Sequence, residues 1–190
     1  MSSIQQSMQS LTEWLNANYP EGLENLNPPA TAEQLSALEQ ALGFDLPEEL
    51  RELLAIHNGQ DAEGGYLFDG QEFLSAERIA EEWSIWKKLL DDKAFAGSHS
   101  RAEKGIRNDW WNTGWVPFTY NGSGDHFCID TCPAEGGVQG QIITLWHDMS
   151  ERDRLAGNLS EWLKSYADDL QRGEFVYSDE YGAILHKDDI

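Results

Sequence analysis

Basic residues are missing from two long parts of this sequence. No Lys or Arg occurs in the first 50 residues, and none occurs between Arg107 and Arg152. The 13 basic residues face 34 acidic ones, which gives a formal net charge of −21. Binding to DNA or RNA needs cations that displace the counterions of the phosphates, so the composition excludes nucleic acid as a partner. The excess of carboxylates favours a basic protein partner instead.

Cysteine and long apolar runs are scarce as well. Cys128 and Cys132 are the only cysteines, and two thiols do not build a disulfide framework. No apolar run approaches the length of a transmembrane helix, and no cationic segment followed by an apolar one opens the sequence. From these absences we expect a cytoplasmic protein that does not contact a membrane.

Aromatic residues, by contrast, are abundant. Eight Trp, seven Phe and six Tyr supply large apolar side chains for a core. A length of 190 residues suits one domain with a sizeable core. We therefore expect a single domain over residues 1–190, with its core region at about 28–170 and an N-terminal helix at 4–16. Residues 94–108 mix Gly, Ser, His, Arg and Lys without a period, and we interpret them as a mobile basic loop and a possible insertion.

Apolar residues at intervals of three and four predict five helices. Capping residues mark two of the starts, because Thr31 with Gln34 forms a capping-box pattern and Asn158 with Glu161 fits a cap. Pro47 suits the first turn of another helix. The five helices are expected to begin near Ile4, Thr31, Pro47, Ser75 and Asn158.

Aromatic and β-branched runs between glycine-containing turns predict short strands. The expected strands cover residues 66–68, 115–120, 127–130, 142–146, 175–177 and 183–185. The segment Asn121–Gly124 is expected to form a turn that needs positive φ. The glycine-rich excursion at 133–140 is interpreted as a connection between two strands, because neither a helix nor a Lys follows it as a phosphate-binding loop requires.

The order of several short motifs resembles a known family. A helix closing with His57-Asn58-Gly59 is followed by a Trp-x-Pro-Phe strand, a Gly-Asp turn, a Gly-x-x-Gly excursion and a strand that ends in Trp-His-Asp. Over roughly residues 28–170 this order is similar to the SUKH superfamily, which includes the Smi/Knr-type fungal cell-wall synthesis regulators and many bacterial immunity proteins. The family positions that map here are Trp115, Pro117, Phe118, Gly124, Asp125, Asp130, Gly140, Trp146 and Asp148.

This resemblance implies an α+β fold in which helices pack against a mostly antiparallel sheet. It also implies a protein that binds and is not an enzyme. We interpret the chain first as an immunity protein whose acidic surface captures a basic toxin domain and blocks its active cleft. The alternative is a regulatory scaffold that binds a signalling or cell-wall enzyme, as the fungal relatives suggest.

The predicted contacts with the partner are acidic side chains at the turns and two Trp residues that are candidates for surface exposure. An aspartate in a turn also caps backbone N–H groups, so that role stays open beside partner contact. A Trp at the surface makes a good interface anchor. The predicted partner-binding residues are Trp110, Trp111, Asp125, Asp130, Glu135 and Asp148.

A third interpretation is a metal-dependent hydrolase built on His126, Asp130, His147 and Asp148. These side chains carry the donors that zinc or a general base requires. However, the sequence has no HExxH helix, no nucleophile elbow and no second cysteine pair beside Cys128 and Cys132. We therefore predict no metal, no cofactor and no catalytic residue, and we leave the oligomeric state open.

Overall fold

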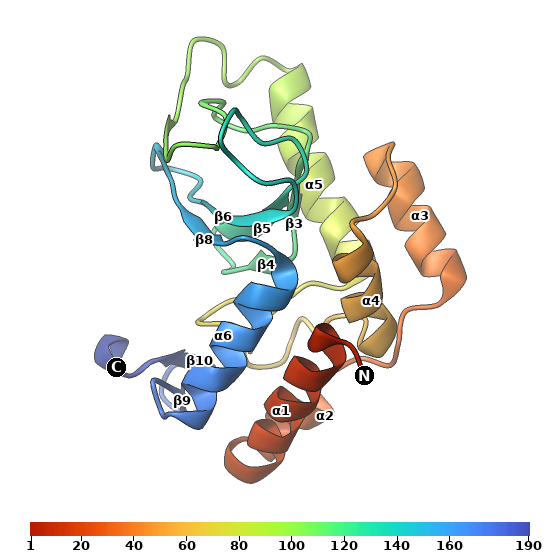
Figure 1. The fold of residues 1–190 in the computed structure, drawn as a ribbon, viewed down its shortest axis with the longest axis vertical. Helices are drawn as coiled ribbons and strands as arrows, with labels where there is room; N and C mark the ends of the chain where they lie inside the picture. The colour runs from red at the N-terminus through yellow and green to blue at the C-terminus, as the bar shows by residue number, and fades with distance from the viewer.

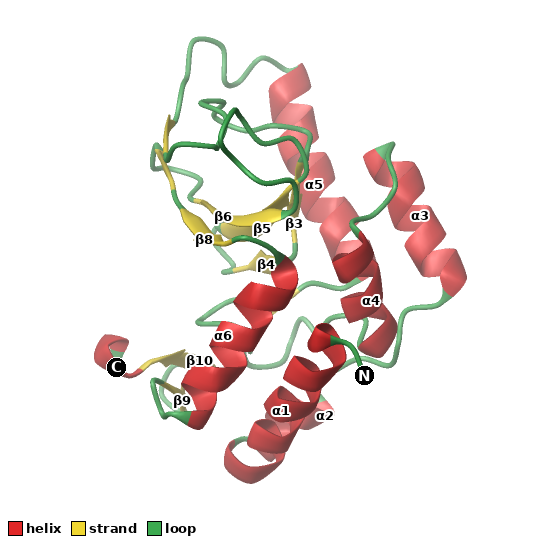
Figure 2. Cartoon of the chain, viewed as in Figure 1, coloured by secondary structure: helices red, strands yellow, loops and turns green.

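The computed structural model describes all residues from Met1 to Ile190. Helices pack against a small, mostly antiparallel sheet in it (Figures 1 and 2), which confirms the predicted α+β class. None of the helices combines the length and the apolarity needed to cross a bilayer. The helices are α1 (Ser3–Asn18), α2 (Pro20–Glu24), α3 (Ala32–Leu42), α4 (Glu48–Ile56), α5 (Ala76–Asp91), α6 (Leu159–Gln171) and the 3-10 helix η1 (Lys187–Asp189).

The predicted caps start these helices as expected. Thr31 and Gln34 exchange the two bonds of a capping box at the start of α3, and Gly43 ends that helix with φ +82°. The Asn158 side chain accepts from the backbone N–H of Glu161 at 2.8 Å and begins α6. The N-terminal helix α1 lies beside α6, so the first and the last long helices of the chain form one layer (Figure 1).

Ten short strands complete the fold. Four of them form an antiparallel sheet in the order β3-β5-β6-β8, and the others pair two by two as β1-β4, β9-β10 and the parallel pair β2-β7. The strands are β1 (Glu72–Phe73), β2 (Arg101–Ala102), β3 (Trp115–Pro117), β4 (Thr119–Tyr120), β5 (His126–Asp130), β6 (Gln141–Leu145), β7 (Glu151–Arg152), β8 (Arg154–Ala156), β9 (Phe175–Ser178) and β10 (Ala183–His186).

Helices cover both faces of the central strand β5, and every residue of this strand is buried. Successive side chains of a strand point to opposite faces. Phe127 therefore packs on Trp162 of α6, with ring centroids 5.9 Å apart, whereas His126 meets Trp86 of α5 on the other face at 6.3 Å. One hydrophobic core cluster of 38 residues extends from Ile4 to Ile184 around this arrangement.

Two strand predictions are wrong in detail. The expected strand at 115–120 is split at the buried Phe118, because its first half pairs with β5 and its second half pairs with β1. The expected strand at 66–68 is absent. Tyr66 makes only an isolated bridge to Ala183, and the strand of this region lies at Glu72–Phe73.

The segment 94–108 packs against the end of the sheet. Its strand β2 pairs with β7, and Ile106 is buried. Gly105 faces the glycine-rich loop, where a Cβ added to Gly105 would lie 2.7 Å from the Cα of Gly137. The Gln141 side chain donates to the Gly105 carbonyl at 3.0 Å. The segment thus forms a layer over the end of β5 and β6.

Candidate functional site

A tight turn between β4 and β5 carries the first of the predicted contact residues. The side-chain Oδ1 of Asn121 accepts from the backbone N–H groups of Ser123 at 2.8 Å and Asp125 at 3.0 Å, which is an Asx-type turn. Gly124 has φ +109°, and a Cβ there would lie 3.1 Å from the Cβ of His147. The glycine is therefore needed both for its backbone conformation and for the close approach of the next turn.

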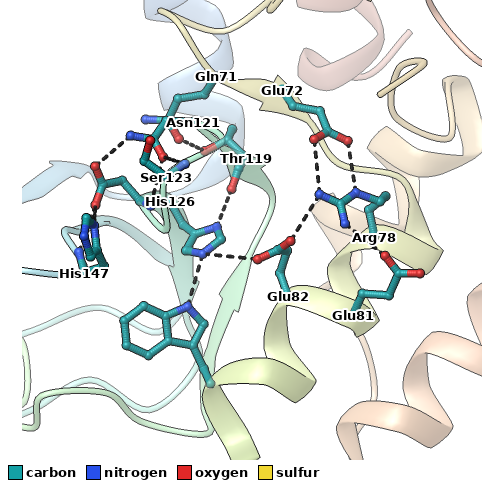
Figure 3. A network of polar contacts seen from close by, with 12 residues as sticks. Gln71, Glu72, Arg78, Glu81, Glu82, Thr119, Asn121, Ser123, His126 and His147 are labelled. Carbon is teal, nitrogen blue, oxygen red and sulfur yellow. Dashed lines mark hydrogen bonds and ion pairs between the residues drawn. The ribbon is translucent and has the colours of Figure 1, made fainter. Parts of the chain in front are cut away.

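Asp125 joins this turn to the end of β6. Its carboxylate accepts from the backbone N–H of His147 at 2.8 Å, from the His147 ring at 2.8 Å and from the Asn121 amide at 2.7 Å (Figure 3). Burial opposes ionisation of this carboxyl, but the three donors outweigh burial and lower its pKa. Asp125 is thus an ionised carboxylate whose acceptor sites are largely occupied by its own chain.

Asp148 follows His147 in the turn after β6 and is the exposed residue beside Asp125. Its side chain is 69% exposed and lies 3.9 Å from the His147 ring nitrogen. One donor atom each of Asp125, His147 and Asp148 lies within 4.8 Å of the other two. We call these three residues the acidic turn.

The four residues of the metal-dependent hydrolase interpretation do not assemble into one site. His126 and Asp130 are fully buried at opposite ends of β5, and only His147 and Asp148 lie together at the surface. His126 faces Thr119, whose backbone carbonyl accepts from its Nδ1 at 2.8 Å, while its Nε2 accepts from Trp86 at 3.1 Å. Both ring nitrogens are occupied inside the fold, so this side chain is not a free ligand.

A buried polar network surrounds His126 on the α5 side of the sheet (Figure 3). Arg78 lies between Glu72 and Glu82, with its guanidinium nitrogens 3.4 Å and 3.1 Å from the two carboxylates. Burial raises the pKa of both carboxyls, although Arg78 acts in the opposite direction. Burial also lowers the pKa of His126 to about 4, so the imidazole is neutral near pH 7.

Two predicted contact residues are corrected by the structure because they are buried. Asp130 is fully buried, and its carboxylate accepts from Gln141 at 2.9 Å and from the backbone of Cys132 at 3.0 Å. Burial raises the pKa of Asp130, and these bonds offset part of the rise. Trp111 is only 3% exposed because it packs against Trp83 and Trp86 of α5. Neither side chain is available to a partner.

The four remaining predicted residues do not form one patch. Trp110 is half-buried beneath the guanidinium of Arg152, which lies 5.3 Å from the ring centroid. Glu135 is exposed on the glycine-rich loop. The antiparallel register of β5 and β6 places that loop and the acidic turn at opposite ends of the two strands. Glu135 and Asp148 therefore belong to different surfaces.

The pattern of elements and turns matches a known group of proteins. A model of the SMI1/KNR4 family (SUKH-1) matches residues 29–165, which is more than half of the chain. The chain belongs to this family. The family assignment agrees with the motif order in the sequence and with the α+β fold.

Three fungal relatives within the family are similar over most of this chain. Cell wall biosynthesis/cell cycle regulator smi1 of Schizosaccharomyces pombe is 27% identical over 95% of the chain and 39% of its own length. Glucan synthesis regulatory protein of Neurospora crassa is 26% identical over 93% and 40%, respectively. Cell wall assembly regulator SMI1 of Saccharomyces cerevisiae is 22% identical over 88% and 40%. This SMI1/KNR4 chain thus spans about two-fifths of the length of these curated relatives.

Sequence reasoning missed the polar network of this SMI1/KNR4 chain. Nothing local in the sequence marks Glu72 and Glu82 as buried or Arg78 as their shared partner. A signal did exist for the turn between β4 and β5, because Asn121 and Asp125 flank two glycines, as in Asx turns. The ring bond between His147 and Asp125 had no such signal, since it joins two separate turns.

Proposed function

We propose that this chain is a non-enzymatic binding protein of the regulatory kind, which captures a basic protein partner. The names of the fungal relatives support a regulatory role, since each is named as a regulator or a regulatory protein. The net charge of −21 supports a partner whose own net charge is positive. We therefore prefer the regulatory scaffold, the alternative interpretation of the sequence, to the immunity protein, which was the first interpretation.

The observation that carries this proposal is the exposed carboxylate of Asp148 on a rigid turn. Asp125 and Asn121 hold that turn in place, and no Lys or Arg occurs within the 44 residues that connect Arg107 and Arg152 in sequence. A carboxylate at a rim accelerates the encounter with a cationic partner and makes the rate sensitive to salt. Buried contacts elsewhere would then determine the rate of dissociation.

The state of the titratable groups supports binding over catalysis. The imidazole of His126 is bonded at both nitrogens, and the Asp125 and Asp130 carboxylates accept bonds from their own chain. Burial raises the pKa of the Cys128 thiol, which makes it a poor nucleophile. A general base or nucleophile needs a free atom within reach of a substrate, and none of these groups offers one.

An immunity protein is a second candidate function. The charge of −21 favours it as well, because a toxin domain with a cationic cleft would be blocked by an acidic surface. Co-expression with toxin domains encoded beside the gene tests this candidate. Restored growth with a purified complex would support it, and unchanged killing by every neighbouring toxin would contradict it.

Capture of partners at two salt concentrations tests the main proposal. We expect the immobilised chain to retain proteins of basic isoelectric point at about 50 mM salt and to release them near 300 mM, since the Debye length falls from roughly 14 Å to about 6 Å over that range. Asp148→Lys should slow association severalfold. Asp179→Lys, an equal charge change on the exposed turn between β9 and β10, is the matched control. Retention without any bias toward basic proteins would overturn the proposal.

A further inference from the structure

A second acidic feature of the molecule is a cleft at the other end of β5. The cleft has a volume of about 590 Å³ and lies where the start of α4, the glycine-rich loop and the start of α6 meet. Pockets for small ligands and side chains have volumes of about 300–1,000 Å³, so this cleft is large enough for one extended side chain with part of its backbone. Its apolar floor consists of the buried residues Leu46, Ile129 and Leu159.

The rim of the cleft is acidic and contains no base. Asp45, Glu48 and Glu49 line it, and no Lys, Arg or His is among its lining residues. Glu49 is already engaged, because its carboxylate accepts from the backbone N–H groups of Leu159 at 2.9 Å and Ser160 at 3.2 Å. The carboxylates of Asp45 and Glu48 are exposed and form no side-chain hydrogen bond or ion pair within the chain. Two carboxylates are thus left for a ligand.

Two helices begin at this cleft, and their ends have to be weighed against the carboxylates. A helix N-terminus carries roughly half a positive charge, which attracts anions. At α6 this charge faces Glu49 and the Asn158 cap, so it is already compensated. At α4 the residue before the helix, Pro47, provides no side-chain cap. The negative charges of the two carboxylates exceed the partial positive charge of this helix end. The uncapped amides of α4 remain as donors for a carbonyl oxygen.

We propose that this cleft binds an arginine side chain carried by an extended segment of the basic partner, an inference that rests on the proposed function. The aliphatic stem would lie on the apolar floor, and the guanidinium would reach Asp45 and Glu48. A carbonyl of the segment would accept from the first amides of α4. A phosphate or a carboxylate is disfavoured by the rim, and a wholly apolar side chain leaves both carboxylates without a partner.

The cleft is separate from the acidic turn. Ile129 and Thr131, which line the cleft, stand at one end of β5, and Asp125 precedes the other end. A partner that covers both sites would have to extend along the strand, about 3.4 Å per residue for the five residues of β5. Variants at one site therefore leave the other unchanged, which allows the two sites to be tested independently.

Short peptides provide the direct test. The probe is an N-acetylated, C-amidated Ala-Ala-Arg-Ala-Ala peptide, titrated into the isotopically labelled full chain and followed through its backbone amide resonances. We expect shifts concentrated at the cleft, at Thr131, Gln139, Gly140 and Asn158, with a Kd on the order of 1 mM, as for one anchored side chain. The same peptide with Gln in place of Arg should leave these resonances within a tenth of that shift.

Charge reversal at the rim identifies the carboxylates involved. Asp45→Lys with Glu48→Lys should weaken binding of the arginine peptide at least tenfold, whereas Asp179→Lys with Glu180→Lys, the matched change on the turn between β9 and β10, should alter it less than twofold. Asp45→Asn with Glu48→Gln serves if the reversed variant does not fold, and it should weaken binding about fivefold. Glu49 is left intact because it caps α6.

The outcomes separate this inference from the proposed function. Equal shifts with the arginine and glutamine peptides, shifts away from the cleft, or equal loss in the rim and control variants would overturn the cleft assignment. Retention of basic proteins by the immobilised chain would still support the proposed function in that case. Conversely, an arginine peptide bound at the cleft by a chain that retains no basic protein would contradict the proposed function alone.

Discussion

The two faces of β5 pack against chemically different side chains. On the α6 side, Phe127 packs with Phe118 around Trp162, and these contacts are apolar and aromatic. On the α5 side, His126 faces Trp86 and Glu82 in a network of charged and hydrogen-bonding groups. Both faces are buried equally well, so burial alone does not tell them apart. The difference lies in how each face responds to a change of pH.

Removal of the Trp162 ring, at the centre of the aromatic contacts on the α6 side, should lower the stability of the fold most. Trp162→Ala is expected to lower the free energy of unfolding by about 3–5 kcal/mol, since it deletes a large ring and leaves a cavity. Trp162 contacts the rings of Phe68, Phe118, Phe127 and Tyr166. Chemical denaturation at pH 7 measures the loss, which should be the same at pH 5 because the one ionisable contact, Tyr166, has a pKa that burial raises well above 10 and is neutral at both pH values. A loss below 1 kcal/mol would contradict the assignment of Trp162 to the core.

The α5 side should instead show a pH dependence that originates in His126. Its pKa is about 4 in the folded chain against an ordinary value of 6.5. A group with a lowered basic pKa stabilises the fold fully above the ordinary value, and this contribution is lost as the pH falls from 6.5 toward 4. Between pH 7 and 4.5 the loss is about 2–3 kcal/mol, since one pKa unit is worth ~1.4 kcal/mol.

The variant His126→Gln isolates this effect. Gln does not titrate, yet its amide can donate to the Thr119 carbonyl and accept from Trp86. Denaturation curves at pH 7 and pH 4.5 should therefore show a decline that is smaller by about 2–3 kcal/mol in the variant than in the wild type. The same decline in both proteins would mean that another group carries the pH dependence.

The smallest effect is expected at Glu82, and it has the opposite sign. Burial raises the pKa of this carboxyl, so its contribution to stability is greatest below its ordinary value of 4.5 and is lost as the pH rises through the raised value. Glu82→Gln should therefore leave stability at pH 7 unchanged or increase it by up to about 1 kcal/mol. Glu81→Gln, which removes an exposed partner of the same Arg78, is the matched control and should change stability by less than about 0.5 kcal/mol. Strong destabilisation by Glu82→Gln alone would show that its pairing with Arg78 dominates.

The contrast between the two faces also explains which features the sequence could reveal. Helix starts depend on neighbours three residues apart, so Thr31 with Gln34 and Asn158 with Glu161 were readable directly. The strand at 115–120 was readable as extended chain, but its division at Phe118 depends on the distant partner β1. The short strands β2, β7 and β8 have no periodicity of their own, and only long-range pairing defines them.

The binding residues were harder to predict for the same reason. Asp130 and Asp148 both follow an apolar run in the sequence, and their local patterns are alike. The segment 94–108 covers the end of the sheet that holds Asp130, where Gln141 reaches both Gly105 and the Asp130 carboxylate, so one aspartate is buried and the other is exposed. In the sequence, the cleft acids Asp45 and Glu48 stand only as charged neighbours of Pro47, where a helix is expected to begin. Asp45 and Glu48 line the same cleft because α4 approaches α6 in the fold. These two helices are more than 100 residues apart in the sequence.

The contact between α1 and α6 has a consequence for synthesis of the chain. α1 leaves the ribosome well before α6, the helix that packs on its apolar stripe of Ile4, Met8, Leu11 and Leu15, because most of the described chain lies between the two helices. Until α6 is made, only α2 and α4 can pack against α1, so the part of the apolar stripe that α6 covers is accessible to chaperones or to neighbouring nascent chains. The layer of α1 and α6 therefore forms only after α6 has been synthesised, and slowed elongation before residue 159 would prolong the interval in which α1 is only partly covered.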